Sequence, residues 1–221
     1  MKLIVNGLTK FIIGILIMGA LIFAPAGSFK FAGGWAFLSL ISMLITVTGT
    51  VLAVKAPKLL EKRLNVNEKE TTQKGVVAFS ALAFLASFVV SGLDFRFGWT
   101  NMPSAVSFFA CFVFVGSYGL YAEVLRENEY LSRTVEVQKG QRVIDTGLYG
   151  MVRHPMYLAT ILLFVSIPLI LGSVWAFLIM LFYPVAIVVR IINEEKVLTE
   201  QLEGYADYKS KVKYRLIPFV W

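Results

Sequence analysis

Cysteine and histidine are almost missing from this chain of 221 residues, which has one of each, Cys111 and His154. A single cysteine excludes an internal disulfide and any cysteine-rich metal site. A single histidine cannot complete a typical zinc site without such partners. Cys111 lies inside an apolar run, where we expect it to pack as a small hydrophobic side chain.

Charge is also scarce, because only 16% of the residues are charged while 57% are hydrophobic. The mean hydropathy is +0.73, whereas roughly a quarter of the residues of an ordinary soluble domain are charged. The sequence therefore predicts a polytopic membrane protein that contacts membrane lipids. The net charge of +7 invites a nucleic-acid interpretation. Lysine and arginine gathered in cytoplasmic loops explain it better, so we expect no nucleic-acid partner.

Several motifs that carry chemistry are absent. There is no G-x-G-x-x-G after a strand and no G-x-x-x-x-G-K-[ST], so Rossmann and P-loop nucleotide sites have no support. H-E-x-x-H is missing, and so is the G-x-S-x-G elbow of many serine hydrolases. No internal repeat or coiled-coil heptad is visible.

Long apolar runs dominate what is present, and a bilayer span needs about 20 such residues. We expect an all-α bundle of five to six transmembrane helices. Its predicted spans are residues 8–24, 33–54, 75–93 and 104–122, followed by a tight hairpin of two shorter runs, 157–171 and 174–189. The hairpin turns at Gly172 and Ser173, and Pro168 and Pro184 should kink its arms. Residues 8–24 also resemble a signal peptide, although we expect a retained span.

The connections between these runs are polar. Residues 55–74 form a charged connector in which Leu59, Leu60, Leu64 and Val66 suggest an interfacial helix. Residues 94–103 should be a short loop. The fourth span should continue as a polar helix into water through AEVLRENEYLSRT. The final residues, LIPFVW, suit an interfacial anchor.

Basic residues indicate the topology. Eighteen of the 21 lysines and arginines fall on one side of the predicted bundle, and only Lys30 and Arg96 fall on the other, with Arg190 at a span end. The positive-inside rule then places both termini and residues 140–157 in the cytoplasm. We expect the cell membrane for a prokaryotic protein.

Polar, cationic and aromatic side chains crowd together in residues 140–157. Pro155 can open a helix at its first position, which puts Arg153 and His154 at a helix N-terminus. Unpaired N–H groups there favour an anionic ligand group such as a carboxylate. The alternative is a juxtamembrane anchor with Arg153 at the headgroups and Tyr149 in the aromatic belt.

A second charged group follows the hairpin. Arg190 and Glu194 are four residues apart and share one helix face; the alternative to a functional pair is a surface ion pair worth under about 1 kcal/mol. Glu195 turns away and should be solvated. We expect Tyr205, Tyr208 and Tyr214 to make interfacial contacts.

These motifs together carry a family resemblance. TGLYGMVRHPMYLAT, an apolar hairpin, R-x-x-x-E-E-x-x-L and GYADYKSKVKYRLIP resemble the C-terminal region of the isoprenylcysteine carboxyl methyltransferase family. The wider group includes membrane phospholipid N-methyltransferases. The resemblance covers residues 133–218 and implies a catalytic region at 126–221, preceded by four transmembrane helices with their connector in 1–125.

The resemblance implies a membrane enzyme that uses S-adenosyl-L-methionine in a cytoplasmic pocket formed by the C-terminal half. Glu194 matches the acidic position that holds the cofactor, and Arg190 matches the cation beside the acceptor, so these two are the implied catalytic residues. The implied cofactor-binding residues, besides Glu194, are Gln141, Arg142, Val143, Ile144, Tyr149, His154, Pro155, Met156 and Tyr157.

The acceptor stays open between two chemistries. A carboxylate on an isoprenylcysteine or similar lipophilic molecule, small or part of a prenylated protein, is already ionised and needs no general base. An amine on a phospholipid head group must lose a proton, for which Glu194, Glu195 or Tyr157 are candidates. A non-catalytic scaffold, transporter or sensor is the third hypothesis. The oligomeric state is not predicted.

Overall fold

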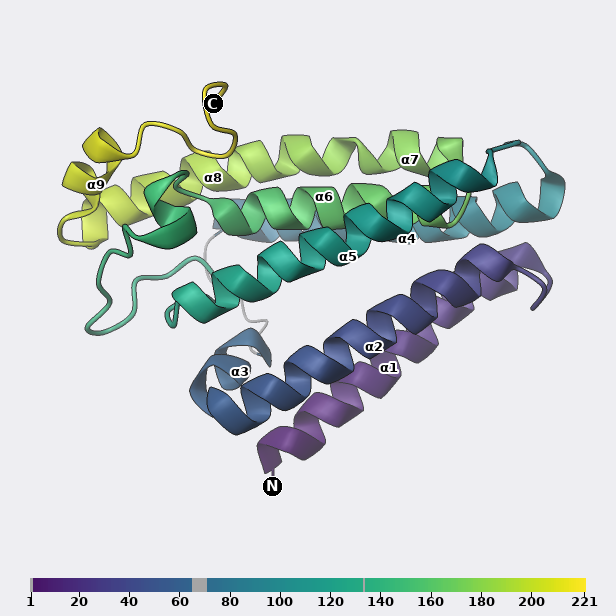
Figure 1. Ribbon diagram of the computed structural model, residues 1–221, viewed down its shortest axis with the longest axis horizontal. Helices are drawn as coiled ribbons and strands as arrows, with labels where there is room; N and C mark the ends of the chain where they lie inside the picture. The colour runs from purple at the N-terminus through teal and green to yellow at the C-terminus, as the bar shows by residue number, and fades with distance from the viewer. Residues whose placement is uncertain (1, 65–70, 133) are drawn as a thin grey trace.

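The chain folds into long apolar helices joined by shorter polar segments (Figure 1). The computed structural model describes residues 2–64, 71–132 and 134–221. The elements in chain order are α1 (Lys2–Ala26), α2 (Ala32–Lys55), α3 (Pro57–Leu64), α4 (Thr71–Phe97), α5 (Ser104–Glu127), the 3₁₀ turn η1 (Gly147–Gly150), α6 (Pro155–Ile170), α7 (Val174–Met180), α8 (Phe182–Gln201) and α9 (Tyr205–Lys211). These described residues contain no strand, which confirms the all-α class.

Five helical stretches within the described residues are long and apolar enough to cross a bilayer. They are Leu3–Ala26, Ala32–Lys55, Thr72–Phe97, Ser104–Glu127 and Val174–Gln201. α6 is apolar as well, but its 16 residues span only about 24 Å, less than the roughly 30 Å of a bilayer core. The chain is therefore an integral membrane protein, as predicted, and each of the first four predicted spans lies inside one of these helices.

The predicted hairpin is present, with a break in its second arm. Gly172 turns the chain in a left-handed conformation (φ +75°) between α6 and α7. α7 ends at Met180 and α8 begins at Phe182. Pro184 explains this break, because it has no N–H to donate to the carbonyl of Met180, four residues earlier. Pro168 lies inside α6, and the kink expected there stays a prediction.

The loop predicted at residues 94–103 begins later than expected, because α4 continues to Phe97. Asp94 is therefore helical, and it is only 2% exposed. Its carboxylate accepts hydrogen bonds from the Thr100 backbone N–H at 2.7 Å and from the Ser173 hydroxyl at 2.5 Å. Asp94 thus ties the end of α4 to the turn of the hairpin, a partner that local sequence could not reveal.

Two further predictions about connections are only partly correct. α5 ends at Glu127 rather than continuing as a helix through the whole polar segment. One face of its last turns is covered by protein, since Val124 and Leu125 are buried, while the side chains of Glu123 and Arg126 are exposed. The interfacial helix expected in the connector exists as α3, and Leu59 is buried. Val66, also named in that prediction, lies outside the described residues.

The helices converge at one end of the bundle and carry polar segments at the other. A hydrophobic core joins the end of α1 and the start of α2 to α4, α5 and α6. A Cβ on Gly92 of α4 would lie 2.5 Å from the Ile22 carbonyl of α1, so a glycine allows this close approach. Both termini, α3, η1 and α9 lie toward the opposite end (Figure 1). The basic side of the predicted topology is therefore one physical end of the molecule.

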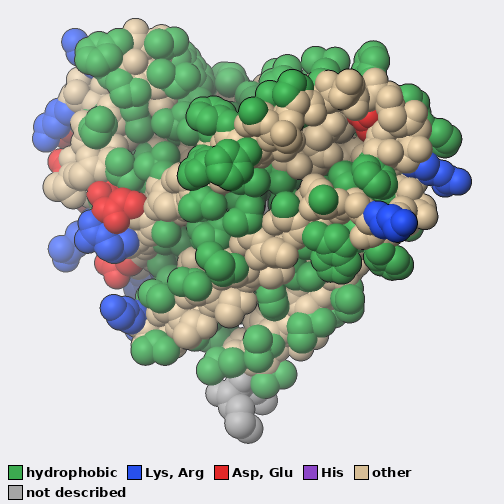
Figure 2. Space-filling model, turned by 45° about the vertical axis from the view of Figure 1, so that its right-hand side comes forward, with side chains coloured by type: hydrophobic (Ala, Val, Ile, Leu, Met, Phe, Trp, Pro, Cys, Tyr) green, Lys and Arg blue, Asp and Glu red, His purple; other side chains and the backbone are tan. Residues whose placement is uncertain are grey.

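Hydrophobic side chains cover most of the face visible in Figure 2, and charged side chains lie near its margins. Such a large exposed apolar surface would be unusual for a soluble monomer. It is the pattern expected for a protein whose middle faces lipid chains.

Candidate functional site

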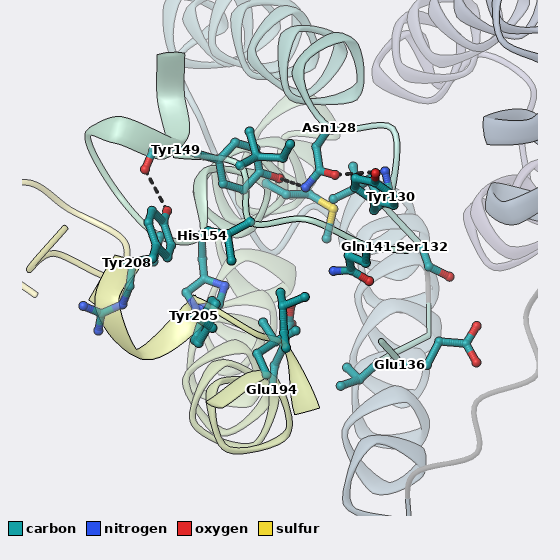
Figure 3. A pocket seen from close by; sticks show the side chains of 18 of the residues that line it. Asn128, Tyr130, Ser132, Glu136, Gln141, Tyr149, His154, Glu194, Tyr205 and Tyr208 are labelled. Atoms are coloured by element: carbon teal, nitrogen blue, oxygen red, sulfur yellow. Dashed lines mark hydrogen bonds between the residues drawn. The ribbon is translucent and has the colours of Figure 1, made fainter. Parts of the chain in front are cut away.

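A pocket lies at the polar end of the bundle, between the α5–α6 connection, α6, α8 and α9 (Figure 3). Its volume is about 830 Å³, its open mouth included. The predicted residues that line it are Gln141, Arg142, Val143, Ile144, Tyr149, His154, Met156, Tyr157, Arg190 and Glu194. Residues from three separate parts of the sequence thus meet around one pocket.

Pro155 is the one predicted pocket residue outside this lining. It occupies the first position of α6 and is almost fully buried. Its place is fixed by the backbone before it, since the N–H of His154 donates to the Arg215 carbonyl at 2.8 Å. The neighbouring N–H of Arg153 donates to the Tyr214 carbonyl at 2.9 Å. Pro155 therefore starts the helix that carries the site, as expected, without facing the cavity.

Glu195 is the centre of a buried ionic cluster, and the prediction that it would be solvated is wrong. Its side chain is 4% exposed, and Oε1 lies 2.6 Å from Arg153 Nε. Oε1 is also 3.4 Å from His154 Nε2, while Oε2 accepts from Arg215 Nε at 3.0 Å. A carboxylate with these partners can stay ionised in a buried position. The tail folds back over this face of α8, which the helical pattern of α8 could not show.

Arg153 holds the tail as well as Glu195. Its Nη1 donates to the carbonyls of Val212 at 2.7 Å and Lys213 at 3.0 Å. One guanidinium thus joins the start of α6, the middle of α8 and the tail. Arg153 is thus a buried structural arginine, which contradicts the alternative of a juxtamembrane anchor at the lipid headgroups.

Tyr157 lies between the two residues that the resemblance implies are catalytic. Its hydroxyl accepts a hydrogen bond from Arg190 Nε at 2.8 Å. The same hydroxyl donates to the Glu194 carboxylate in a very short contact. His154 stacks on the Tyr157 ring with centroids 5.6 Å apart. Arg190 and Glu194 therefore face the pocket through a shared tyrosine, and the simple surface ion pair is excluded.

The connection before α6 is positioned by an acidic residue at the end of α5. Glu127 accepts from the backbone N–H of Leu148 at 3.0 Å. Gly147 makes room for that carboxylate, because it has a φ of +56° and a Cβ there would lie 2.0 Å from Glu127 Oε1. Asn128 donates to the Tyr149 hydroxyl at 3.0 Å. The 3₁₀ turn η1 is thereby held so that Tyr149 faces the pocket.

Two tyrosines of α9 line the pocket, although the sequence predicted interfacial contacts for them. Tyr208 donates to the Tyr149 carbonyl at 2.7 Å. Burial raises the pKa of the Tyr149, Tyr205 and Tyr208 hydroxyls, so all three remain neutral donors at physiological pH. The Tyr205 hydroxyl is buried and has no hydrogen-bond partner among the residues that the structure describes. A buried donor without a partner is costly, and a ligand atom would satisfy it.

Further lining residues were missed by the sequence analysis. They come from the segment after α5 and from the end of α8, namely Asn128, Tyr130, Leu131, Ser132, Thr134, Val135, Glu136, Leu198 and Leu202. The polar segment ENEYLSRT could have indicated these lining residues, because it follows a predicted span and precedes the RHP motif. Within the described parts of the chain, no group of histidine, cysteine and acidic side chains could hold a metal ion.

The site combines acidic, cationic and aromatic side chains beside apolar helices, which suits a cationic cofactor and a lipophilic partner. Comparison with known proteins finds a match for this region. Residues 105–204 match the phospholipid methyltransferase family. The match begins in α5 and ends just before α9, so it contains most of the pocket, including His154, Tyr157, Arg190 and Glu194. The region that matches this family therefore contains most of the site that the geometry defines.

A curated relative shares part of the chain. The Delta(14)-sterol reductase TM7SF2 of Mus musculus is 29% identical over 91 residues, which is 40% of this chain and 22% of the reductase. This chain thus matches about a fifth of that protein's length. The two similarities together support a methyltransferase-like or lipid-modifying function in a membrane.

Proposed function

We propose that this protein transfers a methyl group from S-adenosyl-L-methionine to the carboxylate of an isoprenylcysteine or a similar lipophilic acceptor. The observation that carries the proposal is the arrangement of Arg190, Tyr157 and Glu194 in one pocket. That pocket lies within a region matching the phospholipid methyltransferase family. The negative charge of Glu194 would attract a cationic cofactor, and the positive charge of Arg190 would attract an anionic acceptor. The Tyr157 hydroxyl lies between them.

The residues present fit the cofactor. Its carboxylate, ammonium and sulfonium need opposite charges or aromatic faces, and the lining contains Arg142, Glu194 and several tyrosines. The unpartnered Tyr205 hydroxyl offers a donor for a polar ligand atom. Glu194 would hold the ammonium, the 141–144 segment and Tyr149 would enclose the remainder, and His154 would face it.

When bound, the cofactor supplies an activated methyl group. Tyr157 orients Arg190 through the bond to Nε, and the guanidinium is then placed to align an acceptor carboxylate. The apolar helices α6 and α8 help exclude water from the pocket. Alignment of the two reactants and exclusion of water are sufficient for displacement by a nucleophile that is already ionised.

We further propose that the polar end of the bundle faces the cytoplasm and that, for a prokaryotic protein, the membrane is the cell membrane. The concentration of lysine and arginine toward that end supports this orientation. A lipophilic tail would approach from the bilayer while the head group reaches Arg190. Acceptors of this kind, free or attached to a protein, and membrane lipids are the proposed partners.

N-methylation of a phospholipid head group or another lipophilic amine is the second candidate. The contact of Tyr157 with Glu194 favours it, because a carboxylate in that position can receive a proton from an ammonium acceptor. The similarity of residues 105–204 to the phospholipid methyltransferase family also favours a phospholipid acceptor. A third candidate is a lipid reductase, which the similarity to the sterol reductase supports.

Calorimetric titration of the detergent-purified protein tests these candidates. We expect micromolar binding of S-adenosyl-L-homocysteine by the wild type and loss of that binding in His154→Ala. If the protein instead binds a reduced nicotinamide dinucleotide, the methyltransferase proposal is wrong and the reductase candidate is favoured. If binding occurs, transfer of labelled methyl to S-farnesylcysteine or to phosphatidylethanolamine then decides between carboxylate and amine.

A further inference from the structure

The short helix α3 reaches the pocket from the N-terminal half of the chain. Lys62 Nζ donates to the Glu129 carbonyl at 3.0 Å, and its charge lies 5.6 Å from the centre of the Tyr130 ring. The next residue, Arg63, donates from Nη1 to the Ser132 carbonyl at 3.2 Å. Two consecutive cations of α3 thus bind backbone carbonyls of the segment that follows α5.

Arg63 makes the larger set of contacts. Its Nη2 donates to the Tyr121 hydroxyl of α5, and its guanidinium carbon lies 5.4 Å from the centre of that ring. Its Nη1 also lies 3.9 Å from the sulfur of Met156. One planar side chain therefore touches α5, the segment after it and the first turn of α6. Only arginine presents several donors in such a rigid arrangement.

The segment that Arg63 holds is a wall of the pocket. Tyr130, Ser132 and Met156 all line it. Residues 128–132 form neither helix nor strand. The backbone carbonyls of Glu129, Tyr130 and Ser132 accept hydrogen bonds from side chains outside this segment. The same segment also positions Tyr149, because Asn128 donates a hydrogen bond to the Tyr149 hydroxyl. Displacement of this wall would change the pocket on two sides.

α3 is itself held by α1, because Lys10 Nζ of α1 donates a hydrogen bond to the Leu64 carbonyl at 2.7 Å. Residues 10 and 57–64 lie outside the region that matches the family, which begins at residue 105. The matched region therefore does not contain everything that shapes its pocket.

We propose that Arg63 is a positioning residue of the pocket, which holds the 128–132 wall and Met156 in the arrangement that a bound cofactor requires. It acts through Ser132, Tyr121 and Met156. The N-terminal half then serves as more than a membrane anchor, because α3 completes the ligand site. The identity of the cofactor rests on the function proposed above, but the ordering of the wall by Arg63 does not.

Two measurements on full-length protein in detergent test this role. Hydrogen–deuterium exchange reports the wall itself, through the amides of residues 128–132. Calorimetry with S-adenosyl-L-homocysteine reports the ligand site. In Arg63→Ala we expect at least tenfold faster exchange confined to the wall and about tenfold weaker binding, since a hydrogen bond from a charged group is lost.

Matched variants separate positioning from general damage. Arg63→Lys keeps the charge and one donor, so it should recover part of the binding. Tyr121→Phe removes only the hydroxyl and keeps the ring, so it should give an intermediate effect even if Arg63→Ala folds poorly. Lys58→Ala changes an exposed residue of the same helix and should match the wild type in both measurements.

The outcomes are distinguishable. Unchanged exchange and unchanged affinity in both Arg63→Ala and Tyr121→Phe would overturn the proposal. An equal loss of affinity in Lys58→Ala would overturn it too, because the effect would then belong to the whole helix. If the wild type binds no S-adenosyl-L-homocysteine, the proposed cofactor is wrong, and faster exchange of the wall in Arg63→Ala still supports the role of Arg63.

Discussion

Arg153 Nε lies 2.6 Å from Glu195 Oε1, and the two side chains are only 6% and 4% exposed. This buried pair joins the residue before His154 to the residue after Glu194. The backbone of His154 and the carboxylate of Glu194 are thereby held in one rigid unit. Pocket geometry and the stability of the C-terminal half are consequently coupled.

Glu195→Gln tests that coupling. The substitution leaves the buried cations Arg153 and, in part, Arg215 without a negative charge, which costs about 3–5 kcal/mol for a broken buried pair. We expect a lower midpoint of thermal unfolding and weaker cofactor binding together. Glu200→Gln changes an exposed carboxylate one turn further along α8 and should alter neither quantity. A wild-type midpoint in Glu195→Gln would show that the cluster contributes nothing to stability.

Tyr157→Phe tests the link between Arg190 and Glu194. Loss of the hydroxyl removes the hydrogen bond to Arg190 Nε, so we expect methyl transfer to fall about 10- to 100-fold, the range for a hydrogen bond to a charged group. Single-turnover rates at saturating cofactor measure this effect apart from binding. Tyr183→Phe removes another buried tyrosine hydroxyl on α8 outside the pocket lining, and it should transfer at the wild-type rate. If Tyr157→Phe transfers methyl as fast as Tyr183→Phe and the wild type, the Tyr157 hydroxyl has no role in the transfer step.

The neighbouring tyrosines of α9 should respond in opposite ways to loss of their hydroxyls. Tyr205→Phe removes a buried donor that has no partner within the described part of the chain, so the protein without ligand should keep or gain stability. Its affinity for the cofactor should nevertheless fall. Tyr208→Phe breaks the 2.7 Å bond to the Tyr149 carbonyl and should cost about 1 kcal/mol of unfolding free energy. Thermal unfolding with and without ligand measures both, and a destabilised Tyr205→Phe would contradict the assignment.

Gly147→Ala should damage the site more than Gly140→Ala. Both glycines have positive φ values, +56° and +75°, so alanine costs about 1–2 kcal/mol at either position. Only at Gly147 would the new Cβ meet a side chain, the Glu127 carboxylate that holds Leu148. We expect both variants to lose stability and Gly147→Ala alone to lose most of its ligand affinity. Similar affinities would mean that Glu127 does not position η1.

Alkaline pH should destabilise the pocket through its buried tyrosines. Burial raises the pKa of Tyr149, Tyr205 and Tyr208 above the ordinary value near 10. The folded state therefore holds these protons more tightly than the unfolded state, and stability is complete below pH 10 and declines above it. Unfolding midpoints between pH 8 and pH 11 measure the decline. A Tyr208→Phe variant should show a shallower slope, and an identical slope would argue against burial as the cause.

Much of this architecture could be predicted because it depends on local pattern. Bilayer-length apolar runs predicted the first four spans, and Pro155 predicted the start of α6. The four-residue spacing of Arg190 and Glu194 correctly placed both on one side of α8, facing the pocket. The predicted division at residue 126 has no direct test, although the contacts of α3 cross it.

The errors share one physical cause. Glu195 was predicted to be solvated because the spacing on α8 turned it away from Glu194, but spacing does not reveal what packs against a face. The tail supplies Arg215 there, and the start of α6 supplies Arg153. Tyr205 and Tyr208 were misplaced for the same reason, since the fold of α9 against the pocket is a long-range contact.

The sequence by itself thus determined that the chain crosses a membrane, which segments form its long apolar helices and which motifs carry charge. Those properties follow from the free energy of placing side chains in lipid or in a helix. That free energy depends mainly on the residues of each segment and little on the rest of the fold. Tertiary structure decided which charges are buried together, that Tyr157 joins Arg190 to Glu194, and that Arg63 reaches the pocket wall. Such contacts join residues 33 to 93 positions apart, and only the packing of helices brings them within reach.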